Sequence, residues 1–155
     1  MRFHRLLWLF PVAVTLHNAE EAIAFPPFAL EHAARLPLLV SPAAFRFALA
    51  VLTLAAWLVT YCAWRRGPRS LSAHLFFGCA AAMLINVFVP HIPAALRFAA
   101  YTPGLLTAVF VNLPVMSLLL YLAWRDGFVH PRRALAFGVA VPIGIAAAAA
   151  MFFHL

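Results

Sequence analysis

Three side chains that can perform acid–base or metal chemistry, His17, Glu20 and Glu21, lie within an apolar run that spans residues 6–25. An apolar run of about 20 residues is long enough to cross a bilayer as one helix. Each charged group in such a span costs roughly 2.5–3.5 kcal/mol on translocon-insertion scales. The chain has only four acidic residues. Two adjacent carboxylates in one apolar run therefore indicate a functional site.

The spacing of these residues places them on one face of the predicted helix. Glu20 follows His17 by three positions and Glu21 follows it by four, so both carboxylates flank the imidazole. The structural alternative is a polar contact that joins helices. Two adjacent carboxylates fit it poorly, because like charges at close range cannot both ionise at low dielectric. We therefore expect metal ligands or an acid–base group here.

Other polar residues occur later in the chain, and each also has a purely structural explanation. Asn86 could form a hydrogen bond between helices, and His91 lies between prolines as a solvated loop imidazole would. Tyr101 is typical of an aromatic anchor at the membrane surface, and Asn112 of a helix–helix hydrogen bond. We expect the remaining candidates in a hydrated loop (Glu31 and His32) or at helix ends near the membrane surface (His4, His74, His130 and His154).

The composition is that of an integral membrane protein built from helices. The chain has 155 residues, of which 66% are hydrophobic and 10% charged, and its mean hydropathy is +0.98. This length accommodates one compact bundle, residues 1–155, without a second domain. The net charge of +7 comes from arginines in short loops, which indicates topology control and not a nucleic-acid-binding face. Cys62 and Cys79 lie in apolar runs, and we expect neither a disulfide nor a redox role for them.

Five apolar runs predict an all-α bundle of five transmembrane helices, at residues 6–25, 43–64, 71–89, 104–124 and 134–153. Two of the helices are expected to begin at Ser41-Pro42 and Thr102-Pro103, because each pair combines an N-cap residue with a proline at the first helical position. The first run has some features of a signal peptide. It continues to full span length and carries two acids, so we expect it to be retained.

The arginines are divided unevenly between the two sides of this bundle. Three belong to one side, Arg35, Arg46 and Arg97, and eight to the other: Arg2, Arg5, Arg65, Arg66, Arg69, Arg125, Arg132 and Arg133. The positive-inside rule then predicts a cytoplasmic N-terminus and an external C-terminus. In this orientation the polar residues of the first, third and fourth helices share the outer half of the bundle, where we expect one outward-facing pocket.

The residues of this pocket resemble the signature of a known family. His17-Asn18-Ala19-Glu20-Glu21 matches the motif of the HXXEE family of small bacterial membrane proteins. That family's second landmark is an Asn and a His, then Tyr-x-Pro-Gly and a Pro; this chain has Asn86, His91, Tyr101-Thr102-Pro103-Gly104 and Pro114. The resemblance covers roughly residues 10–125. It implies a multi-pass protein of the bacterial inner membrane with a site of catalytic residue types, but no assigned reaction.

Two versions of a membrane-embedded enzyme agree with these residues. In the first, His17, Glu20, Glu21 and His91 bind a divalent metal, Zn²⁺ or non-haem Fe²⁺, that activates water or polarises a substrate oxygen. In the second, one Glu stays protonated as the general acid, while its neighbour or His17 is the base and Asn86 and Tyr101 hold the substrate. Either version predicts a lipid-like or apolar substrate.

Two other classes of function remain open. A transporter or channel subunit could use the Glu pair as a proton or cation site. With five helices it would need to form a homo-oligomer, and the inner half of the bundle lacks the polar residues of a transport path. A non-catalytic membrane subunit explains the topology but leaves the Glu pair unexplained. Partners expected from the sequence are the lipid bilayer and a small lipid-like molecule, and not nucleic acid.

Overall fold

The computed structural model describes residues 3–33 and 41–154, and every regular element in these ranges is a helix. The elements, with η marking π-helical turns, are α1 (Phe3–Leu6), α2 (Leu9–Glu31), α3 (Pro42–Arg66), α4 (Leu71–Asn86), η1 (Val87–His91), α5 (Ile92–Phe98), α6 (Leu105–Thr107), η2 (Ala108–Asn112), α7 (Leu113–Arg125) and α8 (Pro131–His154). Arg2 and Arg35 of the charge comparison lie outside the described residues. The all-α class is confirmed.

Among the described residues, four helical segments are long and apolar enough to cross a membrane, which indicates a membrane protein: Pro42–Arg66, Leu71–Phe98, Leu105–Arg125 and Pro131–Met151. Two of them are composite, because η1 joins α4 to α5 and η2 joins α6 to α7. α2 is as long as these segments. It is not among the four, because His17, Glu20 and Glu21 lower its hydropathy.

Serine side chains fix the starts of two helices. Ser41 Oγ at α3 and Ser70 Oγ at α4 each accept a hydrogen bond from the backbone N–H three residues ahead, at 3.2 and 3.1 Å. These caps satisfy N–H groups that have no partner within the helix. The start expected at Ser41-Pro42 is therefore found. The start expected at Thr102-Pro103 is wrong, because α6 begins only at Leu105.

Prolines do not end two of the helices where the sequence predicted. α2 continues through Pro26 and Pro27 to Glu31: the φ of proline is compatible with a helix, although each proline removes one backbone hydrogen bond and crowds the carbonyl four residues earlier. The third helix continues from α4 through η1 and α5 to Phe98, with a kink at Val89, whose φ and ψ are −148° and 109°. An extended residue before a proline is expected on steric grounds. As a result His91 is helical and buried, not part of a solvated loop.

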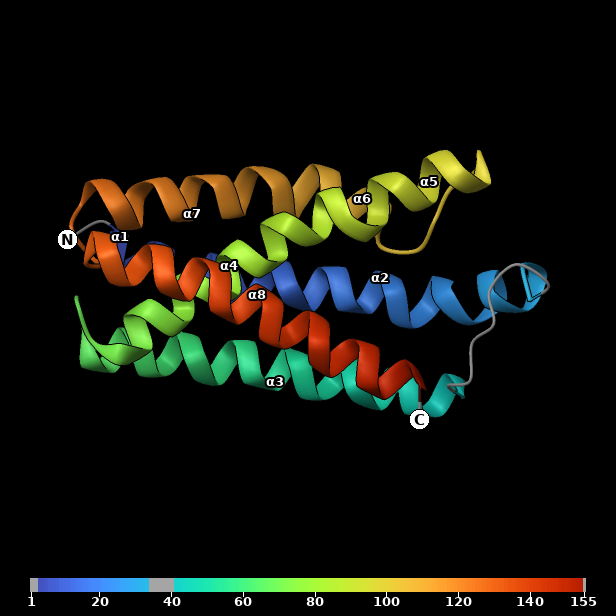
Figure 1. Ribbon diagram of the computed structural model, residues 1–155, viewed down its shortest axis with the longest axis horizontal. Coiled ribbons are helices and arrows are strands. Elements are labelled where there is room, and N and C mark those ends of the chain that lie inside the picture. Colours follow the sequence, from blue (N-terminus) through green and yellow to red (C-terminus); the bar gives the residue numbers. More distant parts are fainter. Residues whose placement is uncertain (1–2, 34–40, 155) are drawn as a thin grey trace.

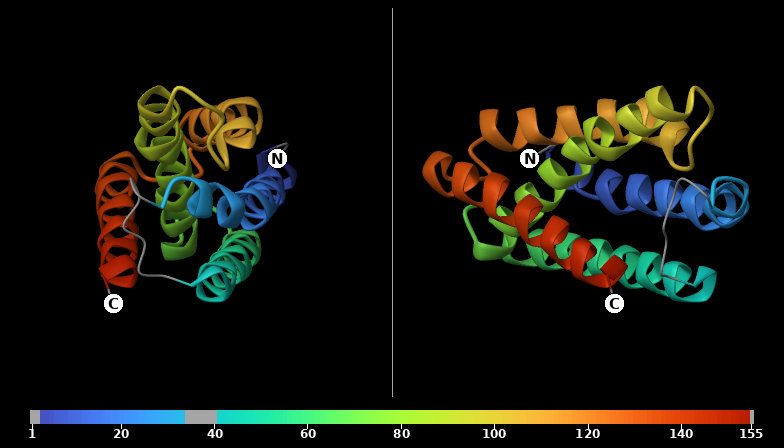
Figure 2. Two further views of the ribbon diagram at one scale, coloured as in Figure 1. Left: turned by 90° about the vertical axis from the view of Figure 1, so that its right-hand side faces the viewer. Right: turned by 45° about the vertical axis from the view of Figure 1, so that its right-hand side comes forward.

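The bundle is organised around α4, which crosses the other helices obliquely (Figure 1). α4 packs against α3, α7 and α8, while α2 packs against α3, α7 and η2. Figure 2 shows the helices from the end, with α8 on the far side of α4 from α2. α4 and α8 approach closely at Gly78, where a Cβ atom would lie 2.7 Å from the Phe137 carbonyl oxygen.

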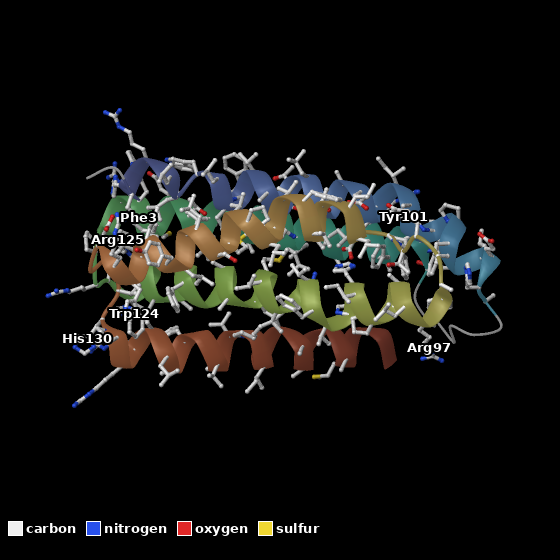
Figure 3. The ribbon with its side chains drawn as sticks, turned by 90° about the horizontal axis from the view of Figure 1, so that it is seen from above. Phe3, Arg97, Tyr101, Trp124, Arg125 and His130 are labelled. Atoms are coloured by element: carbon white, nitrogen blue, oxygen red, sulfur yellow. The ribbon has the colours of Figure 1, made fainter. Side chains whose placement is uncertain are left out.

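The two ends of the bundle differ in chemistry (Figure 3). Phe3, Trp124, Arg125 and His130 are at one end, and Arg97 and Tyr101 are at the other. The apolar core runs from the first end into the middle of the bundle, and its largest buried side chains include Leu7, Phe10, Phe76, Met116 and Leu119. The Tyr101 end holds the buried polar residues described next.

Candidate metal centre

His17 and Glu21 of α2 meet His91 of η1 in the interior. Their ligating atoms all lie within 4.8 Å of one another. Glu21 Oε1 is 3.8 Å from His17 Nε2 and 3.6 Å from His91 Nε2. Both imidazoles are buried, while the Glu21 side chain is 19% exposed. Two imidazoles and one carboxylate from two separate helical segments thus converge on one small space.

Asn86, in the last turn of α4, fixes the direction in which both imidazoles face. Its Nδ2 lies 3.2 Å from His17 Nε2 and 2.9 Å from His91 Nε2. An amide N–H can only donate, so with Asn86 in this orientation both Nε2 atoms are unprotonated and accept its hydrogen bonds with their lone pairs. The opposite nitrogen of His17, Nδ1, is 2.9 Å from Thr107 Oγ1 and donates to it. Asn86 and Thr107 therefore orient the imidazoles as metal-binding histidines are oriented, with Nε2 toward the shared space.

Gly104 closes one side of this group. The rings of His17 and His91 meet edge to face with their centroids 4.8 Å apart. A Cβ atom on Gly104 would lie 2.6 Å from His91 Cε1, 2.9 Å from His17 Cε1 and 3.0 Å from Glu21 Cγ. The glycine also has a φ of +82°, which side chains with a Cβ rarely adopt. Any larger residue would displace the ligands.

Glu20 points to a different set of partners from its neighbour Glu21. Its carboxylate accepts hydrogen bonds from Tyr101 Oη at 2.6 Å, from Thr107 N at 2.8 Å and from Leu106 N at 3.3 Å. Glu20 thus caps the start of α6 from another helix, the role that the sequence gave to Thr102. It is not part of the ligand group among the described residues. Successive residues on a helix project about 100° apart, which separates the two carboxylates.

Tyr101 lies in the loop between α5 and α6, outside the membrane-spanning segments, and its hydroxyl is a donor to Glu20. Burial and the hydrogen bond to the Glu20 carboxylate raise the pKa of Tyr101 to about 12. The side chain is 44% exposed. It is therefore both at the surface, as an anchor would be, and connected to the interior by one strong hydrogen bond.

Comparison with known proteins agrees with the motif. A family model described as "Protein of unknown function with HXXEE motif" matches residues 8–119. The chain belongs to the HXXEE family. It is 35% identical over 112 residues to the uncharacterized protein YrkK of Bacillus subtilis (strain 168). The aligned residues make up 72% of this chain and 70% of that protein. No solved structure matches the chain.

Within this HXXEE chain, the structure brings together most of the residues singled out from the sequence. His17, Glu21, Asn86 and His91 form one group, and Glu20 and Tyr101 form a second group beside it. Thr107 connects them, because its hydroxyl contacts His17 and its backbone N–H contacts Glu20.

Three residues near the motif were not singled out from the sequence as contributors to the site. Gly104 and Thr107 shape it directly. Asn18, within the motif itself, donates from Nδ2 to Thr53 Oγ1 at 2.8 Å and to Leu49 O at 3.2 Å, which joins α2 to α3. The polar type of Asn18 in an apolar run was the available signal. Nothing in the sequence distinguishes Thr107 from other threonines.

Several polar residues have surroundings other than those expected. Asn112, predicted to bond between helices, is buried with no hydrogen-bond partner for either amide atom among the described residues, because its segment packs into the apolar core. His32 lies, partly exposed, in the turn that follows α2, and its ring also stacks on Phe28 with ring centroids 4.3 Å apart. His74 is at a helix end as expected but is fully buried, and its ring joins the two loops at that end of the bundle.

Proposed function

We propose that this HXXEE protein crosses the bacterial inner membrane five times, with its N-terminus in the cytoplasm. α2 has 23 residues and so spans about 35 Å at 1.5 Å per residue, enough for the hydrocarbon core. It packs against α3 and α7 along the bundle. Arginines support the orientation among the described residues. Arg97 lies at the Tyr101 end, and Arg46 is in the first turns of α3, which begin at that end; the others belong to α1 or to the ends of α3, α7 and α8 and their loops at the opposite end (Figures 1 and 3).

We propose further that His17, Glu21 and His91 bind a divalent metal ion. The observation that carries this proposal is the convergence of their ligating atoms within 4.8 Å. Metal–ligand bonds of 2.0–2.2 Å in a tetrahedron place neighbouring ligand atoms about 3.3–3.6 Å apart. The separations from Glu21 Oε1, 3.6 and 3.8 Å, are close to this range. All three ligating atoms lie within 4.8 Å of one another, so side-chain movements of about 1 Å would bring them to these separations.

The donor set favours zinc or ferrous iron. Two imidazoles and one carboxylate are the protein ligands of many hydrolytic zinc sites and of non-haem iron oxygenases. Asn86 lies next to both Nε2 atoms and, with its amide turned over, presents an oxygen to the same space. A bound divalent ion supplies Lewis acidity toward a water molecule or a substrate oxygen.

The surroundings of the site favour an enzyme that acts on a lipid-like or apolar small molecule. The imidazoles are buried, whereas Glu21 and Tyr101 are partly exposed, so access is from the Tyr101 end of the bundle. Tyr101 and Asn86 offer polar atoms beside the ligands that could hold a substrate headgroup. Exposed apolar residues on the same end, among them Leu96 and Leu106, provide contact with acyl chains.

The interior below the site supports this one-sided arrangement over a transport path. Phe10, Ala13, Val14, Phe76 and Ala80 are all buried in the apolar core. A path for protons or cations needs polar groups or water throughout the membrane. We therefore favour the enzyme, and a carrier that uses the Glu pair stays the alternative.

Metal analysis tests the proposal. The detergent-purified chain is equilibrated with Zn²⁺ or, under anaerobic conditions, Fe²⁺, passed through a desalting column and measured by elemental mass spectrometry. We expect about one equivalent of one metal in the wild type and in Glu31→Ala, whose carboxylate on α2 is exposed and outside the group. We expect its loss in His17→Ala and Glu21→Ala. A wild type without metal would overturn the metal centre.

Activity is tested on the same proteins. Lipid extracts of bacterial membranes are incubated with the metal-loaded wild type and with Glu21→Ala, and the products are compared by mass spectrometry. The enzyme proposal predicts a mass change that appears only with the wild type. A metal-binding wild type that changes no lipid would contradict the proposed substrate class and leave the metal centre standing.

A further inference from the structure

A second charged feature lies at the opposite end of the bundle from the metal centre. A cavity of about 330 Å³ opens there, lined by the side chains of Arg69, His130, Arg132 and Arg133, and we call it the basic pocket. His130 is at this end in Figure 3, remote from Tyr101. Every residue that lines the cavity is basic, and the proposed metal chemistry uses none of them.

The basic pocket is formed by two loops that are hydrogen-bonded to each other. The backbone N–H of Arg69 donates to the Phe128 carbonyl at 2.7 Å, which joins the α3–α4 loop to the α7–α8 loop. The backbone N–H of His130 donates to Nε2 of buried His74 at 3.0 Å. Arg69 also has a φ of +60°, an uncommon conformation for a residue with a side chain. The fold therefore fixes the backbone from which the basic side chains project.

The positive charge of the basic pocket is not neutralised by the protein. Within the described part of the chain, the one ion pair formed by an arginine joins Arg125 to Asp126. The other three carboxylates of the chain belong to α2, in its half toward the Tyr101 end. α8 begins at Pro131, beside the pocket, and its first-turn N–H groups add partial positive charge. An anion of tetrahedral oxygens suits several guanidinium groups at once.

The basic pocket lies at the level along the bundle where a lipid headgroup would lie. Trp124 is exposed at this end of the bundle (Figure 3), and Tyr121, one turn earlier in α7, and Trp64, in the last turn of α3, are exposed as well. Such residues mark the boundary between membrane and water. Leu71 and Leu135 begin the exposed apolar surface of α4 and α8 just beyond the pocket, and are 61% and 69% exposed. Charged groups above an apolar surface match a lipid that has a phosphate above its acyl chains.

We propose that the basic pocket binds a phosphate group, supplied by an anionic phospholipid of the leaflet on that side. Its volume is at the low end of ligand sites, about 300–1,000 Å³, which suits one headgroup. Basic pockets between transmembrane helices on the cytoplasmic side commonly bind such headgroups. The lipid would fasten the N-terminal ends of α4 and α8 to the membrane surface.

Native mass spectrometry of the full chain in detergent tests this proposal. The protein is titrated with dioleoyl phosphatidylglycerol, and in separate arms with dioleoyl phosphatidylcholine and with inorganic phosphate. The pocket variant carries Arg132→Gln and Arg133→Gln. Its control carries Arg65→Gln and Arg66→Gln, which remove the same charge at the same end without lining the cavity.

We expect the pocket variant to bind phosphatidylglycerol about 30-fold more weakly than the wild type, and the control to lie within about threefold of it. Phosphatidylcholine, whose phosphate is paired with choline, should bind more weakly and respond little to either variant. Equal losses in the two variants, or no loss of either ligand in the pocket variant, would overturn the site. Binding of inorganic phosphate that the pocket variant loses, with no loss of phosphatidylglycerol binding in that variant, would support the phosphate site and overturn the lipid as its source. Unchanged metal content in both variants separates this test from that of the metal centre.

Discussion

Two groups of residues with buried histidines lie at the two ends of one path, α4 with η1, in which two helices meet across a kink at Val89. His74 begins this path, and both of its ring nitrogens contact the backbone: Nδ1 lies 2.7 Å from Ser70 O, and Nε2 lies 3.0 Å from His130 N. His91 ends the path and meets His17. The Nε2 atoms of that pair face the Asn86 amide and the Glu21 carboxylate instead.

The difference between the two groups lies in what the ring nitrogens face, not in burial. At His74 the backbone satisfies the ring completely, and the histidine acts as a connector between two loops. At His17 and His91, two lone pairs and a carboxylate from separate segments are directed at one space. A metal ion satisfies such a group, whereas the backbone cannot. Convergence of lone pairs therefore distinguishes the candidate site from a structural histidine.

Replacing one histidine from each group should separate the two roles most strongly. His91→Ala removes a ligand, so we expect metal affinity to fall at least about 100-fold, because even the residues that only orient ligands contribute 10–100-fold. His74→Ala should leave the metal stoichiometry unchanged and lower the stability of the fold by about 1–3 kcal/mol, because the His130 N–H loses its partner and the Ser70 carbonyl keeps only the backbone N–H of residue 74. Elemental analysis and thermal unfolding measure the two effects.

The opposite pattern of metal loss would contradict the roles assigned to His74 and His91. Loss of metal in His74→Ala without unfolding would place a ligand role at the wrong end of the helix. Full metal content in His91→Ala would remove His91 from the site.

A methyl group at Gly104 should disturb the ligands without removing any of them. The added Cβ would lie 2.6 Å from His91 Cε1 and 2.9 Å from His17 Cε1. We expect Gly104→Ala to lower metal affinity by about 10–100-fold, as do changes in the residues that orient ligands. Gly67→Ala is the matched control, because Gly67 has a φ of +72° with open space around its would-be Cβ. Competition with a chromogenic chelator measures both affinities; equal values would contradict the close contact.

Substitutions of the adjacent residues Glu20 and Glu21 should also differ in their effect on metal affinity, and the effect of replacing Glu20 should be smaller than that of Gly104→Ala. Glu20→Ala removes the acceptor of the Leu106 and Thr107 N–H groups. Loss of such a cap costs about 1 kcal/mol of stability. It also frees Thr107, which orients His17, so we expect a metal affinity up to about tenfold weaker.

Replacement of each glutamate by glutamine tests whether Glu20 and Glu21 have different roles. Glu20→Gln keeps an oxygen acceptor and should recover most of the affinity that Glu20→Ala loses. Glu21→Gln replaces a charged ligand with a neutral one and should remain defective. If the two glutamine variants behaved alike, the division of roles between capping and ligation would be wrong.

The apolar runs in the sequence were enough to predict the helical class and the approximate positions of the four most apolar spans. Hydropathy at this density leaves few alternatives in a bilayer. The extents of α2 and of the path through η1 could not be predicted. Whether Pro26 or Pro90 ends a helix or only bends it depends on packing that replaces the lost hydrogen bond, and packing is not local.

The site was predictable to the level of residue types and not of roles. The motif identified His17, Glu20 and Glu21 as candidates. Which of the two carboxylates contacts His91 depends on the rotation of α2 about its axis within the bundle, and the motif does not determine that rotation. The sequence placed His91 among the candidate ligands and His74 at a helix end near the membrane surface, but it could not show that both are buried. Their burial and their partners come from contacts between segments that are distant in the chain.

Tyr101→Phe should produce the smallest effect, visible in an alkaline titration. Ordinary tyrosine titrates near pH 10, whereas burial and the Glu20 hydrogen bond raise the pKa of Tyr101 to about 12. The folded protein holds this proton more tightly than the unfolded chain does. The stability that Tyr101 contributes is therefore complete below about pH 10 and is lost as the pH rises toward about 12.

Ultraviolet absorbance of tyrosinate measures this titration, and subtraction of the Tyr101→Phe spectrum isolates one of the three tyrosines in the chain. We expect the difference signal to have a midpoint near pH 12 and to move toward pH 10 in Glu20→Gln, where the carboxylate charge is absent. A midpoint near pH 10 in the wild type would mean that the phenol does not hold Glu20 in solution. The contact between the surface loop and the metal centre would then depend on the Leu106 and Thr107 N–H groups alone.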